Sequence, residues 1–160
     1  LLRNWEALKQ AERQASGKAA AAESMLDSVP SSLPAVMEAF QASTKVARVG
    51  FEWPDASGAL DKLEEETGEL RAEARATPRD PDRVRDEVGD LLFTAVNVAR
   101  LLGVDPESAL KAANRKFRRR FGHVEARLRE KGRGPADSSL GEMEALWQEA
   151  KAAERRGGAR

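Results

Sequence analysis

The chain has 160 residues, and its 27 basic residues balance its 27 acidic residues, so the net charge is zero. This balance excludes a bulk charge that would draw the chain to nucleic acid or to a membrane surface. The sequence has no cysteine and one histidine, His123, which excludes disulfides, thiolate nucleophiles and a metal centre made of several histidines of one chain. No run approaches the ~20 apolar residues that cross a bilayer, and nothing resembles a secretory signal, so we expect a soluble cytoplasmic protein of one domain.

The N-terminal part of the chain predicts two helices joined by a linker. Residues 2–23 are rich in Ala, Glu, Gln, Lys and Arg, which favour helix, although the apolar face is thin. A linker follows over 27–32, and the next helix is expected to run to about Arg48 with Pro34 in its first turn. Residues 49–57 are predicted to form a loop.

Two further helices are predicted on either side of the break at 76–81. The first is expected over 57–76, and the second begins at the helix start Asp80-Pro81 and continues to Gly103. From Val88 onward this second helix is apolar almost all round, which predicts a buried rod. The exceptions are Asp90, Thr94 and Asn97, which follow Glu87 at helical steps of three, four and three residues and form one polar stripe with it.

The C-terminal part predicts another helical pair. Asp105-Pro106 repeats the same start signal, and the helix is expected to run to about Lys131, before the stop at 132–135. Ser139 and Glu142 have the spacing of a capping box for a last helix. No segment shows convincing two-residue alternation, so the sequence predicts an all-α fold.

Four acidic residues are placed symmetrically about Pro78. Glu66 and Glu69 form one i,i+3 pair, and Glu87 and Asp90 form another at the same distances beyond the turn. If the two helices fold back on each other, these carboxylates converge, and a hard cation such as Mg²⁺ would relieve their repulsion. The alternative is an ordinary solvated acidic face. The position of Asp90 in an apolar run argues against this alternative, because an unpaired carboxylate is costly there.

A cation held in this way keeps coordination positions for water and for phosphate oxygens of a substrate. It also lowers the pKa of a bound water enough to make a nucleophile. Glu65, beside Glu66, is a candidate for deprotonating that water; taken by itself, a solvated surface glutamate is the simpler interpretation.

Several cations accompany the acids. Lys116 and Arg120 are i,i+4 neighbours on one flank of their helix, a pair that suits a polyphosphate. The basic run 115–120 also allows a nucleic-acid stripe or plain surface charge. Lys62 and Arg83 each lie four residues before an acid of the group, where charge pairing within the helix and substrate contact are both open.

Two uncharged side chains complete the candidates. Asn97, on the polar stripe, is suited to bind either substrate or a neighbouring helix end. Trp147 is a candidate for stacking on a nucleobase, although core packing is the more frequent use of tryptophan.

These motifs occur together and in order. The segments 49–54, 62–69, 87–93 and 113–121, followed by Trp147 and Lys151, closely resemble MazG nucleoside triphosphate pyrophosphohydrolases. The resemblance implies an all-α, four-helix-bundle fold, a homodimer, and dependence on Mg²⁺, with Mn²⁺ as a substitute. It further implies cleavage of nucleoside triphosphates between the α- and β-phosphates, giving the monophosphate and pyrophosphate.

The resemblance also implies roles for residues and domains. By it, the metal ligands are Glu66, Glu69, Glu87 and Asp90, and the substrate contacts are Lys62, Arg83, Lys116, Arg120, Trp147 and Lys151, with a weaker case for Asn97. Arg83 and Arg118 depart from the residues typical of the family. The chain resembles the C-terminal, catalytic half of such proteins, with a linker helix over 1–26, the catalytic domain over 27–155 and a flexible tail over 156–160.

The two rival predictions are a helical nucleic-acid-binding or scaffold module, and an enzyme of the same kind acting on a phosphoribosyl-nucleotide pyrophosphate.

Overall fold

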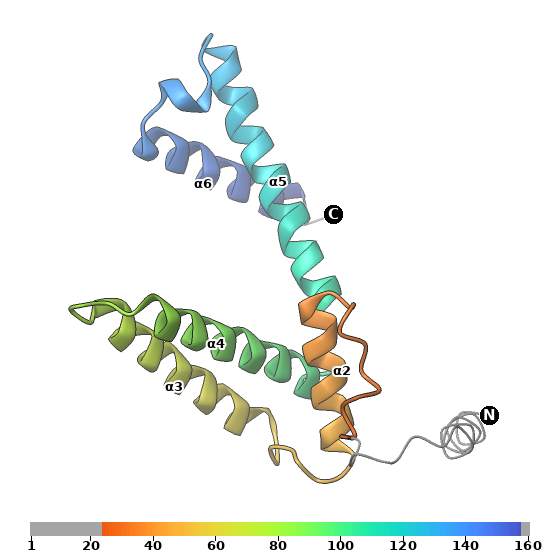
Figure 1. Cartoon of the computed structure of the whole chain (residues 1–160). Coiled ribbons are helices and arrows are strands. Elements are labelled where there is room, and N and C mark those ends of the chain that lie inside the picture. Colours follow the sequence, from red (N-terminus) through yellow and green to blue (C-terminus); the bar gives the residue numbers. More distant parts are fainter. Residues whose placement is uncertain (1–23, 158–160) are drawn as a thin grey trace. The chain divides into compact units, whose positions relative to one another are not determined.

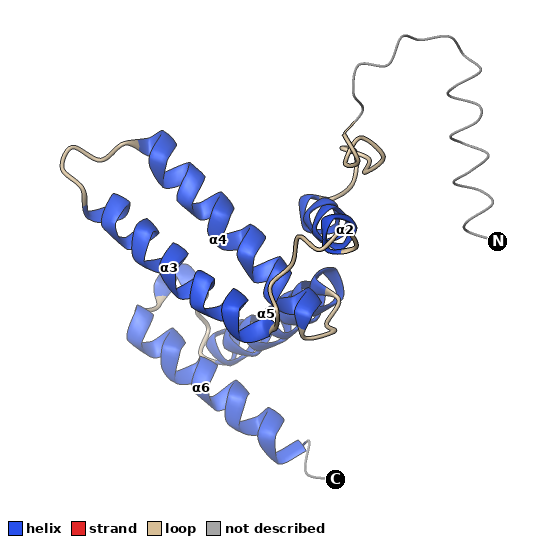
Figure 2. Cartoon of the chain, turned by 90° about the horizontal axis from the view of Figure 1, so that it is seen from below, coloured by secondary structure: helices blue, strands red, loops and turns tan. Residues whose placement is uncertain are grey.

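The computed structural model describes residues 24–157, and these residues form helices, turns and loops without a strand (Figure 2). The all-α prediction is therefore confirmed. In chain order the elements are α2 (Ala35–Ala47), α3 (Ala56–Arg75), α4 (Pro81–Leu101), α5 (Pro106–Glu130), the short 3₁₀ helix η1 (Pro135–Asp137) and α6 (Leu140–Gly157), as Figure 1 shows. The linker helix predicted for 1–26 lies, up to residue 23, outside the described residues, as do 158–160 of the predicted tail.

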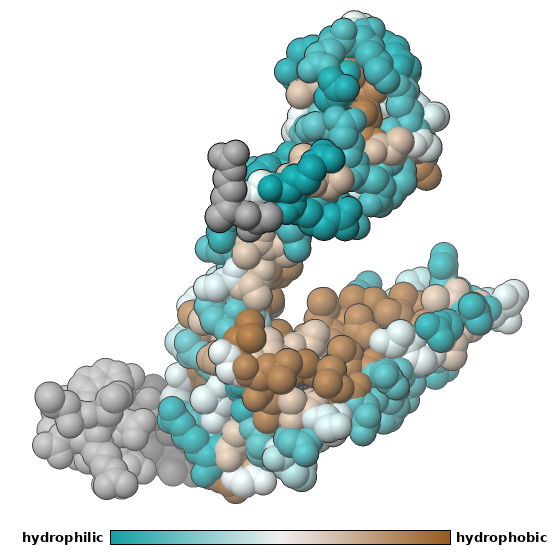
Figure 3. All heavy atoms as spheres, turned by 180° about the vertical axis from the view of Figure 1, so that it is seen from behind, coloured by the Kyte–Doolittle hydropathy of each residue, from teal (hydrophilic) through white to brown (hydrophobic). Residues whose placement is uncertain are grey.

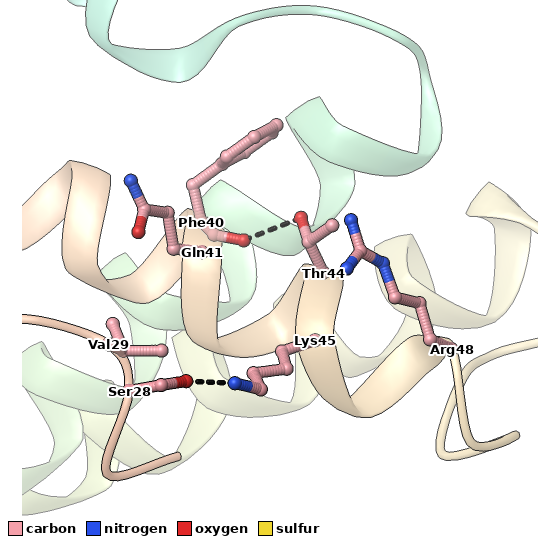
Figure 4. A pocket seen from close by; sticks show the side chains of 7 residues that line it. All are labelled: Ser28, Val29, Phe40, Gln41, Thr44, Lys45 and Arg48. Carbon is pink, nitrogen blue, oxygen red and sulfur yellow. Dashed lines mark hydrogen bonds between the residues drawn. The ribbon is translucent and has the colours of Figure 1, made fainter. Parts of the chain in front are cut away.

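The chain divides into two compact units, Leu1–Trp53 and Pro54–Arg160. In the first unit, α2 begins directly after Pro34, which is the N-cap with an extended ψ of 137° and not a residue of the first turn as predicted. The unit contains an open pocket of about 270 Å³ between the segment around Ser28 and one face of α2 (Figure 4). Lys45 Nζ donates a hydrogen bond to Ser28 Oγ at its edge. None of the predicted site residues lines this pocket.

In the second unit, α3 and α4 form an antiparallel hairpin (Figures 1 and 2). The Asp55 side chain accepts hydrogen bonds from the backbone of Ser57 at 2.8 Å and of Gly58 at 3.3 Å, so α3 starts one residue earlier than predicted. Asp80 accepts from the Asp82 backbone N–H at 3.0 Å, with Pro81 in the first turn of α4 as predicted. These caps satisfy N–H groups that have no partner inside a helix, and they fix where each helix begins.

A second helical hairpin consists of α5 and α6, which are joined through η1 and pack on each other. The side chains of Val124, Leu128 and Leu146 form its buried core, against which Met143 and Trp147 pack. The predicted cap at Asp105 is present, since its carboxylate accepts from the Glu107 N–H at 3.3 Å. These four helices therefore form two hairpins, α3–α4 and α5–α6, and each hairpin packs mainly on itself.

Part of the apolar surface of α4 is exposed in the single chain. Val88 is 38% exposed, Phe93 44% and Leu92 61%. The prediction of a rod buried all round is therefore wrong for the isolated chain, because the other described residues leave the outer face of α4 uncovered. None of the described helices has the length and apolarity that crossing a bilayer requires.

The turn between α5 and α6 is held by a carboxylate with two cations. Glu142 Oε1 lies 3.0 Å from Lys131 Nζ and 2.6 Å from Arg133 Nη2, which lowers the pKa of Glu142. The predicted capping box is present in one direction, as the Glu142 N–H donates to Ser139 Oγ at 3.2 Å. The Glu142 carboxylate itself bonds to the two cations.

Glu142→Gln is expected to lower Tm at pH 7 and to have little effect at strongly acidic pH. A carboxyl whose folded-state pKa is depressed stabilises the fold above its unfolded pKa, near 4.5, and this contribution is lost as pH falls through the lower folded value. Thermal unfolding of both proteins from pH 7 down to pH 3 checks this. Equal Tm values at pH 7, or a difference that grows with acidity, would contradict it.

Candidate active site

Three carboxylates converge between α3 and α4. Glu66 and Glu69 come from α3 and Glu87 from α4, and one oxygen of each lies within 4.8 Å of the others. Their i,i+3 spacing places the two α3 acids on one helix face, and the antiparallel hairpin brings Glu87 opposite them. Glu66 is buried, Glu87 is half-buried and Glu69 is exposed. The structure thus brings together three of the four acids that were singled out from the sequence.

Asp90 lies outside this group and is exposed. The argument that it occupies a buried position is wrong for the isolated chain, because the neighbouring residues Leu92 and Phe93 are exposed as well. Its charge nevertheless acts on Glu87, since Asp90 is one of the acids that raise the pKa of that carboxyl.

The pKa of Glu87 is raised above its ordinary value. The largest cause is partial burial, followed by the negative charges of Glu69, Glu66, Asp90 and Glu73. Burial and like charges both disfavour the ionised form. The site is therefore one where a positive charge among the acids would be stabilising.

Lys62 supplies only part of that positive charge. Its Nζ lies 2.7 Å from Glu66 Oε1 and 2.9 Å from Glu65 Oε1, and these two contacts raise the pKa of the lysine, so it stays charged. The other oxygen of Glu66, Oε2, is buried and has no hydrogen-bond partner among the described residues. A buried carboxylate oxygen without a partner is costly, so this oxygen is suited to bind a cation.

The donor set fits a hard divalent cation. Carboxylate oxygens are the ligands that Mg²⁺ prefers, and two oxygens bound to one Mg²⁺ lie at most about 4.2 Å apart. One carboxylate oxygen of each acid already lies within 4.8 Å of the others, so small side-chain rotations suffice to bring all three to one ion. The unpartnered Glu66 Oε2 is the second observation in favour of such a site.

Arg83 and Asn97 are engaged in contacts within the α3–α4 hairpin. Arg83 Nη2 lies 2.7 Å from Glu73 Oε1 on α3, and this pair joins the two helices near their connecting turn. Asn97 is 1% exposed, with its Nδ2 donating to the Phe93 carbonyl at 3.1 Å and its Oδ1 accepting from Arg100. Asn97 must rearrange before it can contact a substrate, whereas the Arg83 side chain is 66% exposed and keeps further N–H groups for another acceptor.

The remaining predicted substrate contacts lie on the α5–α6 hairpin. Lys116 is exposed on α5, and Lys151 is half-buried on α6. The Arg120 guanidinium carbon lies 5.7 Å from the centre of the Trp147 ring, and the Phe117 ring lies 5.3 Å from the same tryptophan. The structure therefore brings Arg120 and Trp147 together, on a different hairpin from the acids.

Two acids with defined contacts were not identified from the sequence. Glu73 pairs with Arg83, and Glu154 accepts hydrogen bonds from both Arg119 and Arg120. A weak signal existed for Glu154, which follows Lys151 by three residues and so shares its helix face. The partner across the hairpin, 34 residues away, depends on how α5 and α6 pack.

Comparison with known proteins relates this geometry to a family. Residues 56–125, which include α3, α4 and the three converging acids, match the MazG nucleotide pyrophosphohydrolase domain. The chain is 41% identical to the nucleoside triphosphate pyrophosphohydrolase of Escherichia coli (strain K12) over 151 residues. These aligned residues make up 94% of this chain and 56% of that protein. It is 35% identical over 149 residues to the nucleoside triphosphate pyrophosphohydrolase/pyrophosphatase MazG of Thermotoga maritima, 93% of this chain and 54% of that protein.

A third relative is the uncharacterized protein YabN of Bacillus subtilis (strain 168), 44% identical over 156 residues, which are 98% of this chain and 31% of that protein. The chain spans about half the length of the Escherichia coli and Thermotoga maritima relatives. It therefore carries a MazG nucleotide pyrophosphohydrolase domain, which confirms the resemblance that its motifs indicated.

Proposed function

We propose that the chain is the catalytic part of a nucleoside triphosphate pyrophosphohydrolase, which converts a nucleoside triphosphate and water into the monophosphate and pyrophosphate. The observation that carries the proposal is the convergence of three carboxylates around a buried oxygen that lacks a partner, within a MazG domain. Two relatives named for this activity support the substrate class.

Glu66, Glu69 and Glu87 hold Mg²⁺ in this proposal, and Asp90 is a fourth ligand that turns inward from α4. When bound, the ion neutralises phosphate charge and lowers the pKa of a bound water. Glu65 is 58% exposed and is the candidate to accept the proton from the attacking water at its carboxylate. Lys62 holds Glu65 and Glu66 in place through the two contacts described above.

The cations of the α5–α6 hairpin bind the phosphates. Arg120 offers a planar guanidinium and Lys116 and Lys151 offer mobile ammonium groups, which together offset the negative charge of the leaving pyrophosphate. Trp147 offers a ring face for the nucleobase. Because the acids and these cations lie on different hairpins, the nucleotide has to be bound between the two sets.

A homodimer is part of this proposal. Figure 3 shows an apolar area along the α3–α4 hairpin. The exposed apolar side chains of these two helices include Leu60, Val88, Leu92 and Phe93. An apolar surface of this kind is typical of an interface that is covered in the assembled protein. A second copy of the chain is the proposed occupant.

The test is the product of hydrolysis. Mixing the protein with Mg²⁺ and a panel of nucleoside triphosphates is expected to release pyrophosphate and monophosphate, with no orthophosphate unless an added pyrophosphatase is present. Chelation with EDTA is expected to stop the reaction, and added Mg²⁺ to restore it. Release of orthophosphate as the first product would reject the cleavage position, and activity in EDTA would reject the metal requirement.

The rival prediction of a nucleic-acid-binding module has less support from the contacts. Two arginines of the basic run, Arg119 and Arg120, are paired with Glu154, so they are not arranged as a free basic stripe. Salt-sensitive binding to DNA or RNA without Mg²⁺-dependent hydrolysis would favour that rival.

A further inference from the structure

Glu154 of α6 binds two adjacent arginines of α5. Its Oε2 accepts two hydrogen bonds from Arg120, one from Nε at 3.0 Å and one from Nη2 at 2.8 Å. Its Oε1 accepts one from Arg119 Nε at 3.0 Å. The Arg120 side chain is 18% exposed and that of Glu154 is 29% exposed, so this contact is partly shielded from water.

Two neighbours therefore fix the orientation of the Arg120 guanidinium. The Trp147 ring faces it at 5.7 Å, and Glu154 binds the edge formed by Nε and Nη2. A guanidinium has five N–H groups, of which two are used here, so both N–H groups of Nη1 and one of Nη2 remain for another acceptor. These three lie on the end of the guanidinium, which is the edge that takes two oxygens of one phosphate.

We propose that Glu154 is a positioning residue, which holds Arg120 against Trp147 so that the free end of the guanidinium receives the triphosphate of the substrate. This inference rests on the proposed function and adds to it a residue with no contact of its own to the nucleotide.

Simple electrostatics predicts the opposite effect, which makes the proposal testable. The hydrogen bonds from Arg120 and then from Arg119 lower the pKa of Glu154, so it is ionised at neutral pH. A negative charge beside a phosphate site repels the substrate, and its removal alone would tighten binding. Weaker binding after its removal therefore means that orientation of Arg120 matters more than repulsion.

The first test compares Glu154→Ala with a matched variant, Glu149→Ala. Glu149 is also an acid of α6 paired with α5, since its Oε1 lies 3.2 Å from Arg127 Nε. Glu154→Ala is expected to raise KM for a nucleoside triphosphate about 10-fold or more, with a smaller change in kcat, because the lost contacts serve substrate binding. Glu154→Gln keeps an acceptor oxygen and is expected to recover part of the loss. Glu149→Ala is expected to retain the wild-type KM.

A second measurement does not need hydrolysis. Binding of inorganic tripolyphosphate with Mg²⁺, measured by calorimetry, is expected to weaken about 10-fold or more in Glu154→Ala and to stay unchanged in Glu149→Ala. In an Arg120→Ala background, Glu154→Ala is expected to have no further effect, because the group that it positions is gone.

The outcomes separate the two proposals. If the wild type binds tripolyphosphate but releases no pyrophosphate from any nucleotide, the proposed function fails while the positioning role is still decided by the binding data. If Glu154→Ala matches Glu149→Ala in KM and in tripolyphosphate binding, or binds more tightly than the wild type, the positioning role is wrong.

Discussion

Glu69→Gln is expected to reduce pyrophosphate release at least ~100-fold without unfolding the protein. Loss of a group that only supports a metal ligand costs about 10–100-fold in metal affinity or activity, and loss of a ligand itself should cost more. Glu69 is the exposed member of the converging acids, so its side chain contributes little packing. The amide keeps the size of the side chain and removes the charge that a divalent cation requires. Steady-state pyrophosphate release, together with Mg²⁺ or Mn²⁺ binding by calorimetry, measures the effect.

The same substitution is expected to raise Tm in the absence of metal. Glu69 is the strongest of the negative charges that raise the pKa of Glu87, so removing it relieves repulsion in the folded state. Activity and metal-free stability should therefore change in opposite directions, which a general folding defect cannot produce.

Glu64→Gln is the matched control. Glu64 is an exposed acid of α3 whose position in the helical repeat points away from Glu66 and Glu69. This variant is expected to keep wild-type activity and metal binding. Equal activity in both variants would show that the converging acids are not the metal site.

The features that could be predicted from the sequence are those encoded by local spacing. Asp80-Pro81 and Asp105-Pro106 mark helix starts to the residue, because a cap involves only the backbone a few positions ahead. The convergence of Glu66, Glu69 and Glu87 follows from i,i+3 spacing on two helices joined by a short turn. Such inferences need no knowledge of how distant elements pack.

The contacts that escaped prediction depend on packing between elements. The i,i+4 spacing allows Arg83 to pair with Glu87 or to contact substrate, but in the structure it pairs with Glu73 across the hairpin. Which acid it meets depends on the rotation and register of α3 against α4. The pairing of Arg120 with Glu154 depends in the same way on how α6 lies along α5. Side chains of this length reach several neighbours, so sequence spacing alone leaves their partners open.

The apolar residues of α4 show a different limit. Their composition predicts that they are covered, but not by what, and in the single chain Leu92 and Phe93 remain exposed. The same apolar run predicts a buried Asp90, which is exposed in the single chain. An amphipathic pattern indicates that a face avoids water and cannot distinguish a second hairpin of the same chain from a second subunit.

Leu92→Asp is expected to convert the proposed homodimer into a monomer. Burial of a leucine side chain stabilises by about 1.5–3 kcal/mol, and a twofold interface buries it twice. The dissociation constant of the dimer should therefore increase by roughly 150- to 25,000-fold. The folded monomer should survive, because Leu92 is already 61% exposed in the single chain and contributes little to its core. Sedimentation over a range of concentrations measures the mass, and circular dichroism checks the helices.

Leu140→Asp is the control for an added charge at an exposed leucine. Leu140 is 79% exposed at the start of α6, away from the α3–α4 hairpin along the chain, so this variant should keep the wild-type mass. A wild type that sediments as a monomer at micromolar concentration, or a Leu92→Asp variant with unchanged mass, would exclude a second copy as the cover of α4. If the monomeric Leu92→Asp variant also loses pyrophosphate release while Leu140→Asp keeps it, the two hairpins need the partner to bring the acids and the phosphate-binding cations around one nucleotide.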